Sequence, residues 1–114
     1  MSLYLLTTLS PRMLSPSHAS VDIIALTPQE AFDMITPDTR VGATTPGMRA
    51  LYAQLFPGLD VHTTCSNIKL NAGDKAVILS YLGPKIDASG VPAGNYSLHY
   101  ALAEVFELEQ AAAA

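Results

Sequence analysis

Two Thr-Pro pairs, each following a segment suited to a β-strand, restrict the fold of this chain more than any other feature. They are Thr27-Pro28 and Thr45-Pro46. In both pairs a threonine that can cap a helix precedes a proline, which is favoured at the first helical position. Glu30, three residues after Thr27, completes a capping box. The sequence therefore predicts two helices, each preceded by a strand.

The second of these helices is the main amphipathic one. Four apolar residues fall at the spacing i, i+3, i+4, i+7 and so share one face: Met48, Leu51, Tyr52 and Leu55. Pro57 blocks its continuation and Gly58 permits the chain to reverse. The first helix is short, and its apolar face consists of Ala31, Phe32 and Ile35.

Short apolar or β-branched segments suited to strands are residues 4–8, 20–27, the run into Gly42, 61–70, 75–82 and 95–109. Asn71–Asp74 has the residues of a hairpin turn between two of them. Ala76–Leu79 is apolar without alternation, which indicates a central strand covered on both faces. We expect one α/β domain over residues 1–110, with a mixed β-sheet of about five strands, flanking helices and a β-hairpin, and an alanine tail at 111–114.

Composition excludes several classes of function. The 114 residues carry a net charge of -4 with only six basic residues, which argues against binding of long nucleic acids. The single cysteine, Cys65, allows neither an internal disulfide nor a zinc cluster, so no metal and no cofactor are expected. The apolar run near the start is far too short to cross a bilayer, so no membrane partner is expected.

The sequence lacks a nucleophile elbow, a phosphate loop and a helical His-Glu metal pair, so it indicates no catalytic residue. The three histidines, His18, His62 and His99, have no ligand-like spacing and suit ordinary surface or packed positions. Glycine and proline interrupt residues 83–94 without periodicity, which is typical of a functional loop such as a lid, or of a disordered one.

The turn Gly42-Ala43-Thr44-Thr45 at the start of the second helix is the best candidate for anion binding. The first amides of a helix have no internal partners and point outward. Three basic residues could add charge: Arg12, Arg49 and Lys85. Ser10 follows the first strand, where ligands of open α/β sheets collect. Each has a plainer alternative, namely helix capping for the turn, a turn hydrogen bond for Ser10, and a solvated surface position for the charges.

Three segments together resemble a known family, in order and in spacing. They are "LLTTLSPRML", "VGATTPGMRALYAQLF" and "VHTTCSNIKLNAGDKAVILSYL". The family comprises small proteins of archaeal viruses, phages and mobile elements, among them the viral ring nucleases, anti-CRISPR proteins that destroy cyclic tetra-adenylate. The resemblance implies a homodimer in the host cytoplasm that holds the cyclic nucleotide in a pocket shared across the two-fold axis. Ser10 matches a serine that contacts ligand in that family, and Thr8 stands near its usual asparagine.

The chain departs from the family at its catalytic positions. Ala43 occupies the position of the family's catalytic histidine, and a methyl group cannot donate a proton to the leaving oxygen. Loss of such a group typically costs ~10²- to 10⁴-fold in rate. The later loop offers Pro84, Lys85 and Asp87 where the family nucleases carry an Arg and a Glu. Two independent catalytic positions have therefore changed.

Binding can persist where turnover is lost, because binding needs amides, hydroxyls and positive charge but no poised acid. We therefore expect a sponge that sequesters a cyclic oligonucleotide or another nucleotide-derived immune signal without cleaving it. One alternative is a ring nuclease that cleaves without histidine, by aligning the ribose 2'-hydroxyl with the phosphate. Another is a protein-interaction module that kept the fold and lost the ligand site.

Overall fold

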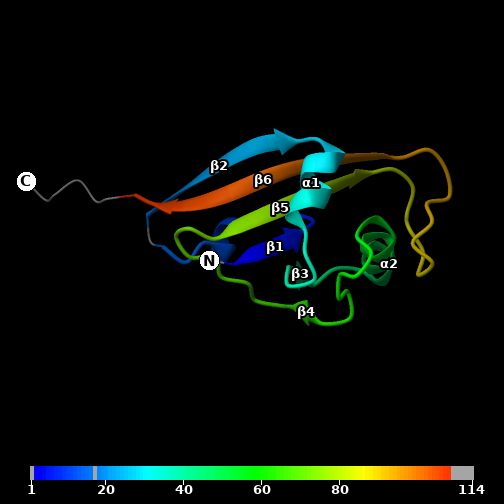
Figure 1. Cartoon of the computed structure of the whole chain (residues 1–114), viewed down its shortest axis with the longest axis horizontal. Coiled ribbons are helices and arrows are strands. Elements are labelled where there is room, and N and C mark those ends of the chain that lie inside the picture. The colour runs from blue at the N-terminus through cyan, green and yellow to red at the C-terminus, as the bar shows by residue number, and fades with distance from the viewer. Residues whose placement is uncertain (1, 17, 109–114) are drawn as a thin grey trace, which may run out of the picture.

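A mixed β-sheet forms the centre of the structure, a computed structural model that describes residues 2–16 and 18–108 (Figure 1). Within these residues the strands are β1 (Leu3–Leu6), β2 (Ala19–Leu26), β3 (Arg40–Gly42), β4 (Thr64–Cys65), β5 (Lys75–Leu82) and β6 (Ser97–Glu107). The helices are the 3-10 turn η1 (Pro11–Met13), α1 (Pro28–Met34) and α2 (Pro46–Leu55). The expected alanine tail at 111–114 lies outside the described residues.

The strand order across the sheet is β2-β6-β5-β1-β3-β4. β1 is parallel to both of its neighbours, β5 and β3, whereas β6 is antiparallel to β5 and to β2. The predicted α/β class with a mixed sheet is confirmed. β5 lies inside the sheet, and its residues Ala76, Val77 and Leu79 are buried, as expected for a central strand.

The predicted hairpin at Asn71–Asp74 is wrong. A turn does form there, with the Asp74 amide donating to the Asn71 carbonyl (3.0 Å), but it leads from an irregular segment into β5. β4, the strand before it, pairs in parallel with β3 at the far edge of the sheet. The carboxylate of Asp74 accepts hydrogen bonds from the amides of Asn71 and Ser2, so the turn fastens the start of β1 instead of closing a hairpin. The antiparallel neighbour of β5 is β6.

Side chains of the sheet point to one of two faces. Residues that pair across neighbouring strands point to the same face. On one face, here called the helix face, α1 and α2 contribute side chains to a buried cluster. Figure 1 shows α1 crossing in front of β5 and β6. The sheet residues of this cluster are Leu5, Val41, Val77, Leu79 and Tyr100, and α2 adds Tyr52. The predicted apolar stripe of α2 is thus the stripe that packs on the sheet.

The other face, here called the open face, is covered only in part. Near β1 the segment around η1 and the chain leading to Leu70 enclose a second cluster that includes Tyr4, Leu6 and Val105. Toward β2 the same face has no such cover. Leu6, Ile78, Ala101 and Ala25 pair in a row across four strands, and Ile23 lies on the same face with 61% of its surface exposed.

Both helices begin where the Thr-Pro pairs predict. The Oγ1 of Thr27 accepts from the Glu30 amide (3.2 Å) and the Glu30 carboxylate accepts from the Thr27 amide (2.9 Å), which confirms the capping box. Thr45 caps α2 by accepting from the Met48 amide (3.3 Å). Past α2, Gly58 has a φ of 91°, the left-handed conformation that glycine permits.

Candidate functional site

A hollow of about 250 Å³ opens on the open face at the carboxyl ends of β1 and β3. After these strands the chain leaves on opposite faces, because η1 packs on the open face and α2 on the helix face. Such a division leaves a crevice at the strand ends, where ligands of α/β sheets collect. The walls of this main hollow are Leu6, Thr7, Thr8, Arg12, Met13, Gly42, Ala43, Cys65, Ser66, Asn67 and Ile68.

Close packing at Gly42 shapes one wall of the main hollow. A Cβ atom on Gly42 would lie 2.6 Å from Cδ2 of Leu6 and 3.3 Å from Cδ1 of Ile68. The next residue, Ala43, donates its amide to the Cys65 carbonyl at 2.9 Å, which extends the β3–β4 pairing by one residue. The methyl group of Ala43 is therefore held in the wall. Because Ala43 is exposed, a larger side chain could be accommodated at this position.

The opposite wall consists of η1 and residues 66–70, which are hydrogen-bonded to each other. The Leu70 amide donates to the Met13 carbonyl (2.6 Å), and the Ser15 amide donates to the Leu70 carbonyl (2.9 Å). Asn67 has a φ of 53°, and it is the one non-glycine among the described residues with a positive φ. Asn is among the residues that tolerate this conformation, and such strained positions are concentrated at functional sites.

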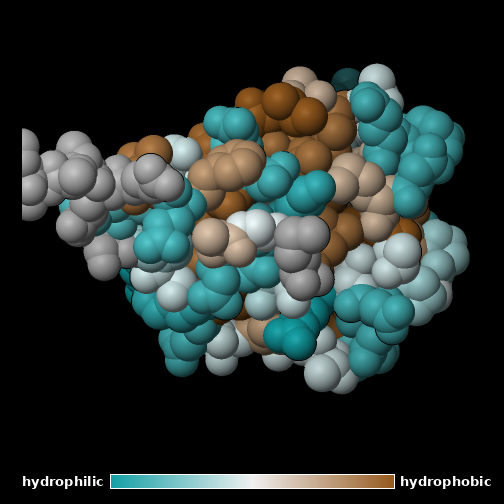
Figure 2. Space-filling view, turned by 60° about the vertical axis from the view of Figure 1, so that its left-hand side comes forward, coloured by the Kyte–Doolittle hydropathy of each residue, from teal (hydrophilic) through white to brown (hydrophobic). Residues whose placement is uncertain are grey.

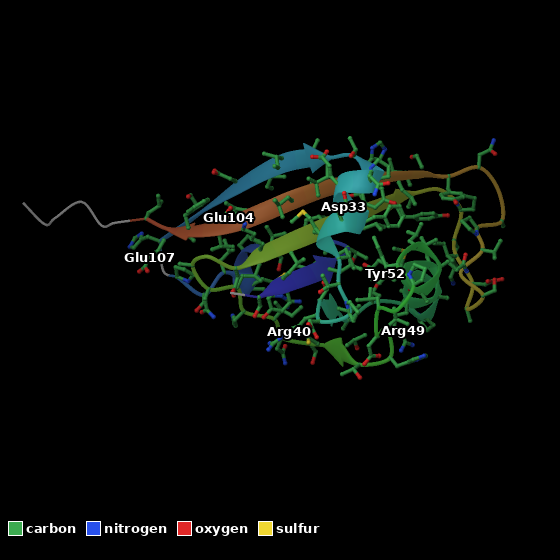
Figure 3. The ribbon with its side chains drawn as sticks, viewed as in Figure 1. Asp33, Arg40, Arg49, Tyr52, Glu104 and Glu107 are labelled. Carbon is green, nitrogen blue, oxygen red and sulfur yellow. The ribbon has the colours of Figure 1, made fainter. Side chains whose placement is uncertain are left out.

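The lining of the main hollow is neutral to positive. It contains one ionised side chain, Arg12, together with hydroxyls, a thiol and an amide, and no Asp or Glu belongs to it. For a chain of net charge -4 this is an uneven distribution. The carboxylates Asp33, Glu104 and Glu107 lie on α1 and β6 (Figure 3). The main hollow therefore suits an anionic ligand better than a cationic one.

Groups with shifted pKa values lie away from the main hollow. Hydrogen bonds from backbone amides and nearby hydroxyls lower the pKa of three carboxyl groups, those of Glu30, Asp60 and Asp87, and each of these closes a local turn or cap. Burial raises the pKa of three phenols: Tyr52, Tyr81 and Tyr100. None of these groups lines the main hollow. The described lining thus presents no carboxyl or imidazole group that could act as a general acid.

The main hollow brings together four of the residues that the sequence suggested for ligand binding: Thr8, Arg12, Gly42 and Ala43. The others lie outside its lining. Thr44 and Thr45 lead into α2, where Thr45 is the cap. Lys85 is exposed on the loop between β5 and β6. Contact of any of these residues with a ligand stays a prediction.

Two further predicted residues, Ser10 and Arg49, have a buried polar atom without a partner. Among the described residues three buried side-chain atoms lack a hydrogen bond: Ser10 Oγ, Arg49 Nε and Tyr52 OH. Arg49 and Tyr52 lie on α2 (Figure 3), and Ser10 precedes η1 next to the main hollow. Burying a polar atom unpaired costs free energy, so each of these groups has bonding capacity to offer a water molecule or ligand.

The sequence interpretation missed Cys65, the last residue of β4, and the three residues that follow it. Cys65, Ser66, Asn67 and Ile68 were assigned to a strand of the wrong hairpin, yet they form a wall of the main hollow. The polar run Thr63–Asn67 was the signal that could have identified a loop there, since it lacks the apolar alternation of a strand.

The loop between β5 and β6, residues 83–96, does not cover the main hollow. It lies against α2, where Gly90 packs on Ala50, and Gln54 Nε2 donates to the Ser89 carbonyl at 3.0 Å. Gly47 of α2 faces the backbone of Ile86 and Asp87 closely enough that a side chain would not fit. Within the described residues the loop packs against α2, and none of its residues lines the main hollow.

The described residues hold no helix long and apolar enough to cross a membrane. They also hold no group of three or more His, Cys, Asp or Glu residues arranged as metal ligands.

Comparison with known proteins identifies a shared fold. No protein-family model and no curated protein sequence matches the chain. Among solved structures, B116 of Sulfolobus turreted icosahedral virus is similar, with a TM-score of 0.67 and 13% sequence identity. The match covers 91% of this chain and 99% of the viral chain. At this identity the similarity establishes the fold alone, which this chain shares with B116.

Proposed function

We propose that this chain is a viral anti-defence protein that binds a cyclic-oligonucleotide or other nucleotide-derived immune signal in the host cytoplasm and withholds it without cleaving it. The observation that carries the proposal is the main hollow itself. It is open, and it has Arg12 and no carboxylate in its lining. Ala43, which by the sequence resemblance takes the place of the family's catalytic histidine, is part of its wall. The shared fold with B116 supports a viral origin.

Chemistry of the lining favours binding over turnover. Hydroxyls of Thr7, Thr8 and Ser66 can donate to phosphate and ribose oxygens, and Arg12 can bind a phosphate through two parallel hydrogen bonds. Cleavage would need a proton donor for the leaving oxygen, and the lining offers no carboxyl or imidazole group. The open state of the main hollow also argues against an interaction module whose ligand site has been filled.

We further propose that the protein acts as a homodimer whose second copy helps to enclose the ligand. A volume of about 250 Å³ is below the ~300–1,000 Å³ usual for small-molecule pockets, so one chain encloses too little of a cyclic oligonucleotide. The apolar row of the open face runs from Leu6, which is buried beside the main hollow, to Ala25 of β2, which is exposed. Figure 2 shows apolar side chains gathered toward the upper edge of the molecule, where β2 lies in Figure 1, and the exposed apolar residues of β2 include Ile23 on the open face and Ile24 on the helix face. A second copy on this row would adjoin the main hollow.

The test mixes the purified protein with a panel of cyclic oligonucleotides and cyclic ADP-ribose isomers. We expect tight uptake of at least one member, and recovery of the intact ligand when the protein is denatured. Arg12→Ala should abolish uptake, whereas Lys75→Ala removes one positive charge from an exposed ion pair with Glu104 (3.9 Å) and should leave uptake unchanged. Absence of uptake across the panel, or linear product in the supernatant, would overturn the sponge.

A further inference from the structure

A second, smaller hollow of about 110 Å³ adjoins the main one on the open face. Its walls are Arg12, Met13, Asn67, Ile68 and Lys69, and the first four of these also line the main hollow. The two hollows are therefore neighbouring compartments that share one wall. Lys69 lines the small hollow only.

Two basic residues, Arg12 and Lys69, line the small hollow. The Lys69 ammonium donates a hydrogen bond to the backbone carbonyl of Arg12 at 2.5 Å, which holds it beside the Arg12 residue. No carboxylate lines either hollow. The ion pair found among the described residues, Lys75–Glu104, joins β5 to β6 and involves neither Arg12 nor Lys69. Like charges gathered without a counter-charge repel each other, so a bound anion would stabilise this arrangement.

The backbone around the small hollow is already fixed. The Leu70 amide donates a hydrogen bond to the Met13 carbonyl. Leu70 directly follows Lys69 and Met13 directly follows Arg12, so this bond joins the two segments that carry the basic residues. Asn67 turns the chain through its left-handed conformation directly before Ile68 and Lys69. Because both walls are fastened, little ordering of the backbone is needed when an anion binds, which favours affinity.

We propose that the small hollow is a phosphate subsite in which Arg12 and Lys69 hold one phosphate group of the ligand, while the main hollow holds the sugar that carries it. Arginine supplies a planar pair of donors and lysine supplies a compact positive charge. Together they suit the oxygens of one phosphate group. The assignment of this phosphate to a nucleotide signal rests on the proposed function. Phosphate binding itself depends only on the two cations and their hollow.

The experiment titrates the full chain with inorganic phosphate and with pyrophosphate, and follows backbone amide shifts by NMR. Shifts should be confined to residues 12–13 and 66–70. Lys69→Met keeps the apolar stem and removes the charge, and it should weaken phosphate binding about tenfold, the effect typical of a lost charged hydrogen bond. Lys75→Met is the matched control and should bind as the unmodified chain does. Equal affinity in Lys69→Met, or shifts confined to other residues, would overturn the subsite.

A second arm separates this inference from the proposed function. The same variants are mixed with the panel of cyclic nucleotides. Phosphate binding that weakens in Lys69→Met, without uptake of any cyclic nucleotide, supports the subsite and overturns the sponge. Uptake of a cyclic nucleotide that is equal in Lys69→Met and the unmodified chain supports the sponge and overturns the subsite. If both are correct, pyrophosphate competes with the cyclic nucleotide and Lys69→Met weakens both.

Discussion

Gly42, the last residue of β3, lies directly against Leu6, the last residue of β1. A Cβ atom at Gly42 would come within 2.6 Å of Leu6 Cδ2, closer than real Cβ contacts. Both residues line the main hollow. The absent side chain thus lets two parallel strands end side by side and keeps the hollow open between them.

Gly42→Ala should reduce both stability and ligand uptake. The added methyl meets the side-chain ends of Leu6 and Ile68. Leu6 is buried and has little room to give way, and overpacking of this kind costs about 1–3 kcal/mol. The displaced side chains would also narrow the main hollow. Chemical denaturation and ligand uptake provide the measurements. Gly94→Ala is the control, because its Cβ would meet only Pro84 Cγ at an ordinary 3.5 Å.

Ala43→His should introduce cleavage if the bound signal is a cyclic oligoadenylate. Ala43 is exposed in the wall, so an imidazole fits and can serve as the missing proton donor. A general acid contributes typically ~10²- to 10⁴-fold in rate. Chromatography of the ligand after incubation should show linear product with Ala43→His and intact ligand with the unmodified chain. Equal amounts of product from both would count against the assignment of position 43.

Ile23→Lys should dissociate the proposed homodimer, because Ile23 shares the open face with the apolar row while the adjacent Ile24 points to the helix face. Both are well exposed, at 61% and 56%, so neither substitution should unfold the chain. Light scattering should report monomers for Ile23→Lys and dimers for Ile24→Lys. Dimers of both variants would place the interface elsewhere.

Gly47→Ala tests the contact between α2 and the loop at 83–96. Replacing glycine by alanine inside a helix normally stabilises by roughly 0.5–1 kcal/mol. Here the new Cβ would lie 2.7 Å from the Asp87 carbonyl oxygen, and backbone cannot move as a side-chain tip can. The clash, at about 1–3 kcal/mol, should outweigh the gain. Limited proteolysis should then cut the loop faster, while phosphate binding at Arg12 and Lys69 stays unchanged.

The capping box predicts a pH dependence of stability. Hydrogen bonds from the Thr27 backbone and side chain lower the pKa of Glu30 below its ordinary value of 4.5. A carboxylate with a lowered pKa stabilises the fold above the unfolded pKa, and this contribution is lost as the pH falls through the folded pKa. Glu30→Gln should therefore lower the Tm at pH 7, and the difference should vanish in more acidic buffer. A difference that persists at low pH would contradict this origin.

The local elements of this chain could be predicted because their causes are local. Thr27 and Thr45 cap helices through side-chain contacts three residues away, and the spacing of Leu51 and Tyr52 marks the buried face of α2 whatever it packs on. The α/β class follows from the alternation of such segments. Of the residues predicted to bind a ligand, Thr8, Arg12, Gly42 and Ala43 line the main hollow, and their contact with a ligand stays a prediction.

Pairing between distant strands was decided only by the tertiary structure. Asn71–Asp74 has hairpin residues, but its turn is used by Asp74 to fasten the start of β1, and β4 pairs with β3 instead. The hydrogen bond from Lys69 to the Arg12 carbonyl, 57 residues earlier in the chain, could not be predicted from the sequence around either residue. Such contacts depend on which strands lie side by side, and that choice is made by burial across the whole sheet, not by any single segment.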